Sequence, residues 1–188
     1  KKSYFLGKSK RSIDNKYTNE GKTPVVLSTT KSVLATIYIA DVLKDTAVSA
    51  IEDLHSLGLK VIMLTGDNKK TAKFIGELAG VDEVVAEVLP TQKANLIKEL
   101  KAQKEIVAMI GDGVNDAPAL ALADVGIAMG TGTDIAIESS NITLIHGDLT
   151  KLVKSIRLSI NTMMTIKENL FWSFIYNIIG IPIAAGVL

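Results

Sequence analysis

Two short apolar runs, Lys60–Leu64 and Ile106–Ile110, each end at a turn that contains glycine and aspartate. Amphipathic stretches of helical length lie between and around these runs, and several of them stop at a glycine. Strands that alternate with helices form parallel sheets covered by helices on both faces. The sequence therefore predicts an α/β fold with a Rossmann-like parallel sheet, whose ligands bind beyond the carboxyl ends of the strands.

The rest of the chain contains further elements of both kinds. Residues 1–24 are polar, rich in lysine and interrupted by glycine, so we expect a loop or the frayed end of something larger there. Apolar and β-branched patterns predict strands over residues 24–29, 32–40, 60–64, 106–110, 125–129 and 142–145. Helical spacing predicts helices over residues 46–55, 69–79 and 115–123, one beginning after Pro90, and one long amphipathic helix from Leu149.

Charge and cysteine content exclude several classes of function. The chain has 21 basic and 20 acidic residues, and so lacks the positive field that attracts nucleic acid. It has no cysteine, which excludes disulfides and thiolate metal sites within these residues. His55 and His146 are expected to be solvated. Any anion must therefore be bound by a local site.

The stretch Leu170–Leu188 contains no charged residue. A helix needs about 20 apolar residues to cross a bilayer, and basic residues precede this stretch, as the positive-inside rule expects on a cytoplasmic side. We therefore predict a transmembrane helix over residues 170–188, in contact with membrane lipid. The alternative is a buried C-terminal helix of a soluble domain, which Gly180 and Pro182 would interrupt.

The first candidate site is formed by Thr65, Gly66 and Asp67, directly after the strand predicted over residues 60–64. The carboxyl end of such a strand presents backbone amides to an anion, and the Thr65 hydroxyl could donate a hydrogen bond to phosphate. The alternative is a plain strand-to-helix turn in which Asp67 caps the next helix.

The second candidate site is the turn GDGVND, residues 111–116, after the strand predicted over residues 106–110. It brings together the carboxylates of Asp112 and Asp116 and the carboxamide of Asn115. Such oxygen ligands suit Mg²⁺, which proteins bind through one or two carboxylates plus phosphate oxygens. Carboxylates packed this tightly repel one another unless a cation lies between them, so the turn predicts a magnesium site.

Lys93 lies between the two motifs in the sequence, in the first turn of the helix after Pro90. Most lysines are solvated surface residues. A lysine in this position could instead reach a phosphate held between Thr65 and the turn at Asp112.

A strand ending in threonine, a later lysine and a strand ending in GDGxND together resemble the haloacid dehalogenase superfamily. The segments MLTGDN and MIGDGVNDAPAL, with ADVGIAMGTGTDIAIESS, look like its P-type ATPase branch. The resemblance implies that Thr65, Gly66 and Asp67 contact the phosphoryl group and that Lys93 neutralises it. It also implies that Asp112 and Asp116 hold Mg²⁺ while Asn115 arranges the site, with ATP and Mg²⁺ as cofactors.

In that family the phosphorylated aspartate belongs to a DKTGT segment, and this string does not occur in the chain. The resemblance therefore implies a C-terminal part of a catalytic core that works with the rest of the same pump. By itself the chain is not expected to turn over ATP.

Tyr176 and Asn177 are polar residues inside the apolar stretch. Polar groups within a membrane are costly unless they have a partner or a function. A Tyr-Asn pair at this place resembles the subgroup that transports monovalent copper or silver, in which this helix helps to form the ion site. The alternative is that Asn177 forms a hydrogen bond with a neighbouring helix.

These inferences give three expected parts: residues 1–35 as a remnant of a nucleotide-binding domain, 36–148 as the phosphorylation domain, and 149–188 as a juxtamembrane and transmembrane helix. The function expected is that of a fragment of a copper-exporting, multi-pass membrane ATPase with its phosphorylation domain on the cytoplasmic side. Two alternatives are a soluble phosphatase of the same superfamily and a non-catalytic module that binds Mg²⁺ and phosphate.

Overall fold

The structure is a computed structural model that describes residues 3–7, 22–30, 32–39, 43–130, 134–144 and 147–186. The chain divides into two compact units, Lys1–Leu149 and Thr150–Leu188. The expected division at residues 35 and 148 stays a prediction.

An antiparallel sheet of three strands contains β1 (Tyr4–Gly7), β2 (Thr23–Thr29) and β3 (Val33–Ile39), in that order. The two strands predicted over residues 24–40 are confirmed as the antiparallel pair β2 and β3. For residues 1–24, the first of the two alternatives, a loop, is wrong at β1, which pairs with β2 and so satisfies its backbone groups at a sheet edge. The second alternative, the frayed end of something larger, stays a prediction. Residues 8–21 of that predicted loop lie outside the described residues.

The strands of the α/β part form two parallel groups. The first group pairs β4 (Ile62–Leu64) with β5 (Glu83–Val85), and the second has the order β6 (Ala108–Gly111), β7 (Val125–Met129), β8 (Ile142–Leu144). The predicted parallel α/β architecture is confirmed. Strand β5 was not expected from the sequence, because three residues are too few to show a period.

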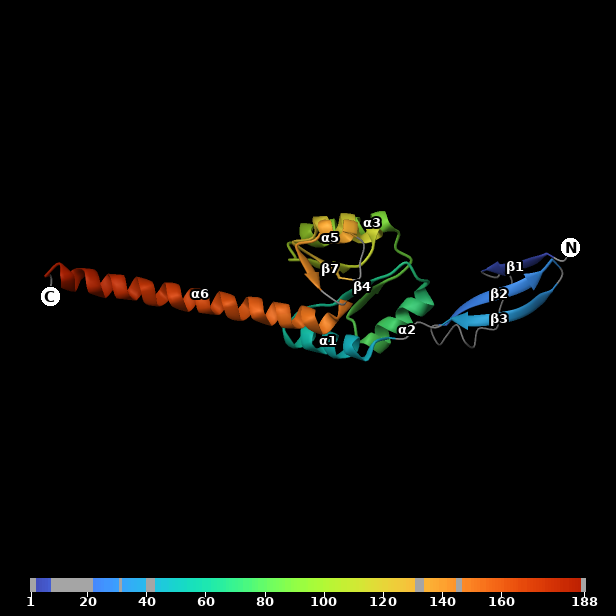
Figure 1. Cartoon of the computed structure of the whole chain (residues 1–188), viewed down its shortest axis with the longest axis horizontal. Helices are drawn as coiled ribbons and strands as arrows, with labels where there is room; N and C mark the ends of the chain where they lie inside the picture. Colours follow the sequence, from blue (N-terminus) through green and yellow to red (C-terminus); the bar gives the residue numbers. More distant parts are fainter. Residues whose placement is uncertain are drawn as a thin grey trace. The chain divides into compact units, whose positions relative to one another are not determined.

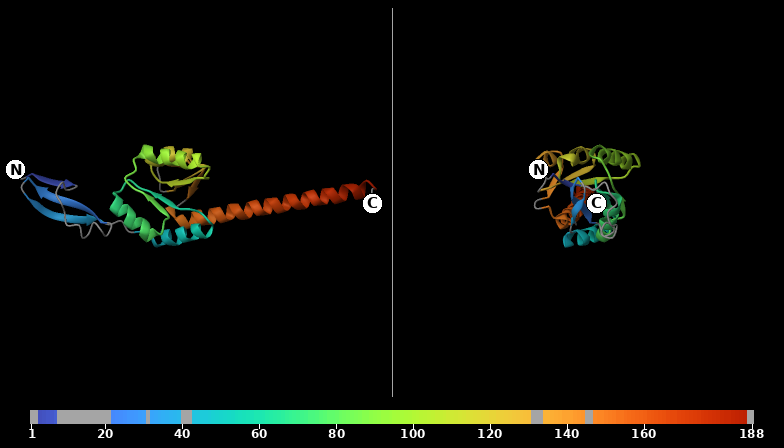
Figure 2. Two further views of the ribbon diagram at one scale, coloured as in Figure 1. Left: turned by 180° about the vertical axis from the view of Figure 1, so that it is seen from behind. Right: turned by 90° about the vertical axis from the view of Figure 1, so that its right-hand side faces the viewer.

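The helices of this part are α1 (Asp45–Ser56), α2 (Lys69–Ala79), α3 (Pro90–Ala102), α4 (Ala117–Leu122) and α5 (Asp134–Glu138), with a 3₁₀ turn, η2 (Val114–Asp116), before α4. Helices α1 and α2 lie on one side of the parallel strands, and α3 and α5 lie on the other (Figure 1). The view from behind shows the same layers, with green α2 and yellow-green α3 on opposite sides (Figure 2). The strands are therefore covered on both faces, as predicted.

A buried apolar cluster lies beneath the second parallel group. It consists of Ile97, Met109, Ala119, Leu120 and Ala136, with Leu64 of β4 packed against it. Helix α4 approaches β7 so closely that a Cβ at Gly126 would lie 2.5 Å from the carbonyl oxygen of Leu120. Close-packed interiors transmit small displacements, so this cluster fixes the ends of the strands where the candidate residues lie.

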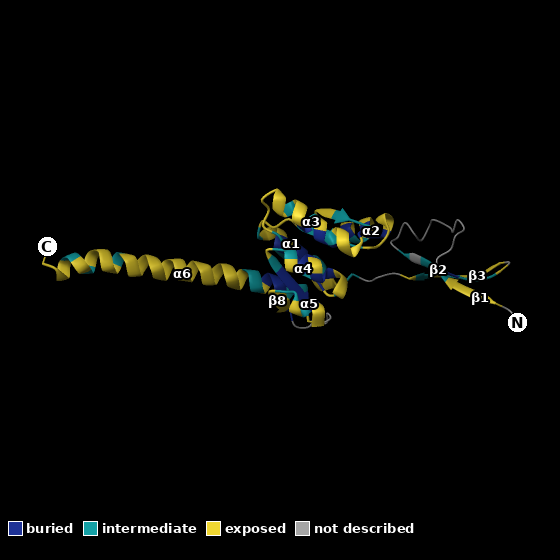
Figure 3. Cartoon of the chain, turned by 90° about the horizontal axis from the view of Figure 1, so that it is seen from above, coloured by how far each residue is buried: buried dark blue, intermediate teal, exposed yellow. Residues whose placement is uncertain are grey.

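The long helix α6 (Leu149–Ala184) confirms the helix predicted from Leu149. Its residues 157–174 are all exposed, and most of the helix is yellow in Figure 3. No helix within the described part of the chain is long and apolar enough to cross a membrane. The transmembrane helix predicted over residues 170–188 is therefore not found among these residues.

Candidate functional site

The loop Thr65–Asp67 begins where β4 ends and is fixed by its own hydrogen bonds. The Thr65 N–H donates to the Val85 carbonyl at 3.0 Å, and the Thr65 carbonyl accepts from the Val88 N–H at 3.0 Å. The Thr65 hydroxyl donates to Asp67 Oδ2 at 2.9 Å and accepts from the Asp67 N–H at 3.1 Å. A threonine side chain is thus held at the carboxyl end of a parallel strand, next to an exposed Gly66 and Asp67.

The alternative role of Asp67 as a helix cap is wrong. Asn68 is the N-cap of α2, and its Oδ1 accepts from the Lys70 and Thr71 N–H groups, both at 3.1 Å. The side chain of Asp67 instead contacts the Thr65 hydroxyl. Asp67 is therefore not required for starting the helix and faces the loop.

The turn Gly111–Asp116 follows β6 and folds tightly around one buried carboxylate. Asp116 is 7 % exposed, and its N–H donates to the Gly113 carbonyl at 3.0 Å. A Cβ at Gly111 would lie 2.6 Å from the Asp116 Cβ, so only glycine fits there. Asp112 and Asn115 are exposed on the same turn. The three predicted oxygen ligands thus differ in burial, with Asp116 inside and the other two at the surface.

Lys93 and Asp116, which are 23 residues apart in the sequence, form an ion pair. Lys93 Nζ donates to Asp116 Oδ1 at 2.8 Å, and the side chains are only 17 % and 10 % exposed. A solvated surface role for Lys93 is therefore excluded. Removing one partner from a buried pair leaves an uncompensated charge, so the pair fixes α3 against the turn of η2.

The donor set of the second turn fits a magnesium ion. Lys93 engages Oδ1 of Asp116, which leaves Oδ2, the exposed Asp112 carboxylate and the Asn115 carboxamide as oxygen donors. Mg²⁺ keeps several waters and needs only one or two carboxylates when phosphate supplies the remaining oxygens. No group of three or more His, Cys, Asp or Glu side chains suited to a metal occurs among the described residues. These side chains could therefore supply only part of the ligand shell of a metal ion.

The structure joins some of the predicted site residues and leaves others apart. Thr65 contacts Asp67, and Lys93 contacts Asp116, but no hydrogen bond or ion pair between described residues links these two pairs. Both pairs lie at carboxyl ends of parallel strands, where the sequence predicted them.

Tyr176 and Asn177 lie on α6, in the second compact unit. Tyr176 is 77 % exposed, and Asn177 is also exposed. A hollow along this helix is lined by Trp172, Ile175, Tyr176, Ile179, Gly180 and Ile183. The assignment of Tyr176 and Asn177 to an ion site stays a prediction.

Sequence reasoning missed the polar contacts at the opposite, amino ends of the strands. The Val61 N–H first, and then His55, hold the pKa of Asp82 below its ordinary value. The Val107 N–H first, and then Lys101, do the same to the pKa of Asp124. Glu83 raises the pKa of the exposed Lys60 through a hydrogen bond and its charge. The expectation that His55 is solvated is therefore incomplete, since it contacts Asp82 at 2.9 Å.

The parallel α/β fold with two polar turns at the carboxyl ends of its strands is accompanied by a family match: the sequence matches the haloacid dehalogenase-like hydrolase family over residues 2–124. The chain belongs to that family. It is 54 % identical over 168 residues to the probable copper-transporting ATPase PacS of Synechococcus elongatus, covering 89 % of this chain and 22 % of that protein. It is 47 % identical over 178 residues to the copper-exporting P-type ATPase of Staphylococcus saprophyticus, covering 95 % of this chain and 22 % of that protein.

Solved structures of ATPases are also similar to this chain. A zinc-transporting PIB-type ATPase in its E2.Pi state has a TM-score of 0.82 at 32 % identity, covering 100 % of this chain and 32 % of that chain. The catalytic domain of the CPx-ATPase CopB-B has a TM-score of 0.63 at 33 % identity, covering 82 % of this chain and 57 % of that chain. The resemblance to the P-type ATPase branch is thus confirmed. The chain spans about one fifth of the length of the curated relatives it matches.

Proposed function

We propose that this chain is the magnesium- and phosphate-binding part of a copper-transporting P-type ATPase, which couples ATP hydrolysis through an aspartyl-phosphate to export of monovalent copper or silver. The observation that carries this proposal is the buried Lys93–Asp116 pair beside the exposed Asp112, at the carboxyl end of β6. The copper-transporting relatives support the choice of ion. The parent protein would be a membrane protein with this part on its cytoplasmic side.

The chemistry proposed for the chain is positioning and charge neutralisation. Thr65 and the amides of its loop would bind phosphoryl oxygens, with the Thr65 hydroxyl exchanging its hydrogen bond from Asp67 to phosphate. Lys93 would place a positive charge near the same oxygens while Asp116 keeps it in position. A bound Mg²⁺ supplies further neutralisation of phosphoryl charge. Fixed charges of this kind provide most of the catalysis in phosphoryl transfer.

The aspartate itself would come from another part of the pump. Among the described strands β4 pairs only with β5, and β6 pairs with no strand but β7, so each has one open edge. Open strand edges present backbone groups that accept a further strand. We propose that the strand bearing the aspartate adds at these edges, between Thr65 and Asp112.

The magnesium assignment can be tested on the 188-residue chain by titration calorimetry. Asp112→Ala should abolish weak Mg²⁺ binding, because the turn loses its exposed carboxylate. The matched control is Asp134→Ala, which removes an exposed aspartate on α5 and should leave binding unchanged. Equal Mg²⁺ binding by the wild type and Asp112→Ala would contradict the assignment.

The ion assignment needs the complete pump. Asn177→Ala and Tyr176→Phe should each lower copper-dependent ATPase activity and transport, because they remove proposed ligands of the transported ion. The control is Asn161→Ala, an exposed asparagine on the same helix. An ATPase activity that depends more strongly on zinc than on copper would refute the choice of copper.

A further inference from the structure

The amino ends of the parallel strand pairs are closed by the same arrangement of atoms. Asp82 Oδ2 accepts from the Val61 N–H at 2.7 Å, while the Asp82 N–H donates to the Val61 carbonyl at 3.0 Å. Asp124 Oδ2 accepts from the Val107 N–H at 2.9 Å, while the Asp124 N–H donates to the Val107 carbonyl at 2.9 Å. Each aspartate directly precedes the second strand of its pair and holds the residue before the first strand.

Each aspartate also contacts a basic side chain from the last turn of the helix that precedes the first strand of its pair. His55 of α1 contacts Asp82 at 2.9 Å, and Lys101 of α3 contacts Asp124 at 2.9 Å. We call Val61, Asp82 and His55 the first clamp, and Val107, Asp124 and Lys101 the second clamp.

The spacing from the basic residue to the valine is the same in the two clamps. Three residues after the cation comes a residue with positive φ, Gly58 at 76° or Lys104 at 68°, and three residues later comes the clamped valine. The helix ends also match, since the Leu59 N–H donates to the Leu54 carbonyl and the Glu105 N–H to the Leu100 carbonyl, both at 3.2 Å. The same local structure thus delivers a cation to the aspartate twice.

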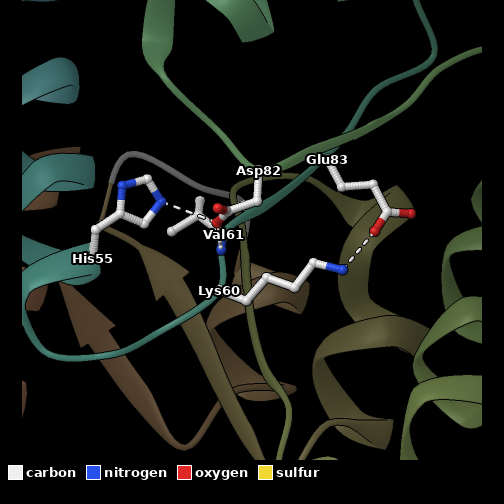
Figure 4. A network of polar contacts seen from close by, with 5 residues as sticks. All are labelled: His55, Lys60, Val61, Asp82 and Glu83. Atoms are coloured by element: carbon white, nitrogen blue, oxygen red, sulfur yellow. Dashed lines mark hydrogen bonds and ion pairs between the residues drawn. The ribbon is translucent and has the colours of Figure 1, made fainter.

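The clamps differ in the chemistry of the cation. An imidazole gains or loses its charge between about pH 5 and pH 8, whereas a lysine ammonium stays charged throughout that range. Beside the first clamp, Lys60 is paired with Glu83 at 2.7 Å (Figure 4). Glu105 acts on Lys60 through its charge. On α2, which packs against α1, Lys73 and Glu77 pair with each other.

The short strand β4 connects the first clamp to the loop Thr65–Asp67. Strand β4 is three residues long, with Val61 directly before it and Thr65 directly after it. The β4–β5 pair is closed by Asp82 at one end and by the hydrogen bond from the Thr65 N–H to the Val85 carbonyl at the other. A strand pair this short opens as one unit. Loss of the hydrogen bonds at one end therefore also exposes the amides at the other end.

From these contacts we infer that the first clamp is a proton-sensitive positioning device for the loop Thr65–Asp67. Protonated His55 forms an ion pair with Asp82 and holds β4 and β5 in register, and neutral His55 holds them less strongly. The second clamp keeps the turn at Asp112 insensitive to pH in the same range. That the loop held in this way binds phosphate rests on the proposed function, whereas the clamp itself does not.

Amide hydrogen exchange measured by NMR on the 188-residue chain tests this inference. After correction for intrinsic rates, protection of the Val61 and Thr65 amides should fall about two- to fivefold between about pH 5.5 and pH 8, the range expected for a partly exposed ion pair. Protection of the Val107 amide should not change. His55→Gln should remove the pH dependence at Val61 and Thr65, and His55→Lys should keep protection high at both pH values.

Two results would overturn the inference. One is the same pH dependence at Thr65 in the wild type and in His55→Gln, and the other is an equal change at Val107. Lys101→Gln is the matched control, since it weakens the second clamp and should lower Val107 protection equally at both pH values. Hydrogen exchange needs neither Mg²⁺ nor ATP, so failure of the magnesium assignment leaves this test intact, and failure of this test leaves that assignment intact.

Discussion

The half of the α/β part that contains β4 and β5 and the half that contains β6 and β7 share one design at their amino ends and diverge at their carboxyl ends. Both are closed by an aspartate that holds a valine. At the other end, the first half has the exposed loop Thr65–Asp67, and the second has a turn around the buried Asp116. The same aspartate–valine contact is thus repeated at the amino ends of the strands, whereas the polar residues at the carboxyl ends differ between the two halves.

The two halves also differ in the residue that lies three positions before the clamped valine and has positive φ. It is Gly58 in the first half and Lys104 in the second, where the side chain makes this conformation cost energy. The first half also has a non-glycine residue with positive φ, Glu87 after β5. The buried Lys93–Asp116 pair belongs to the second half.

The largest loss of unfolding free energy should come from adding a methyl group where a helix packs against a strand in each half. Gly126→Ala would bring its Cβ to 2.5 Å from the Leu120 carbonyl oxygen, whereas Gly76→Ala would meet the Val84 Cγ2 at 2.3 Å. A backbone atom cannot move aside as a side chain can. We therefore expect Gly126→Ala to lower the unfolding free energy by about 3 kcal/mol. At Gly76 we expect about 1 kcal/mol, because alanine also favours the helix.

Urea denaturation followed by circular dichroism measures both losses. Gly180→Ala is the control, since no atom lies within 4 Å of its added Cβ. An equal loss of unfolding free energy at Gly76 and Gly126 would show that both halves accommodate an added methyl group equally well.

A smaller effect should appear on acidification. The pKa values of Asp82 and Asp124 are lowered from the ordinary 3.8, so each carboxylate contributes stability that is present above that value and is lost as the pH falls below it. Asp82→Asn and Asp124→Asn should therefore reduce the unfolding free energy at neutral pH and flatten its decline in acid. The variants and the wild type should become alike in unfolding free energy once the pH has fallen below the lowered pKa values of the two aspartates.

Acid titration of the unfolding midpoint checks this prediction. Asp134→Asn, at an exposed position outside both clamps, serves as the control. A decline in acid that is as steep in the variants as in the wild type would show that the clamps do not contribute to the pH dependence.

Sequence patterns were sufficient for the two candidate loops but not for their contacts. A strand that ends in TGD or GDGVND places those residues at the carboxyl end of the strand, because the position depends on local chain order alone. The burial of Asp116 by Lys93 depends on how α3 packs against η2, and no local pattern encodes that packing. His55 was missed for the same reason, although the repeated spacing from cation to valine was present in the sequence.

By itself the sequence determined the alternation of strands and helices, the two polar turns and the family, because each follows from residues close together in the chain. Tertiary structure decided which polar groups meet: Lys93 with Asp116, His55 with Asp82 and Lys101 with Asp124. These outcomes depend on packing between distant segments, which neighbouring residues alone do not specify.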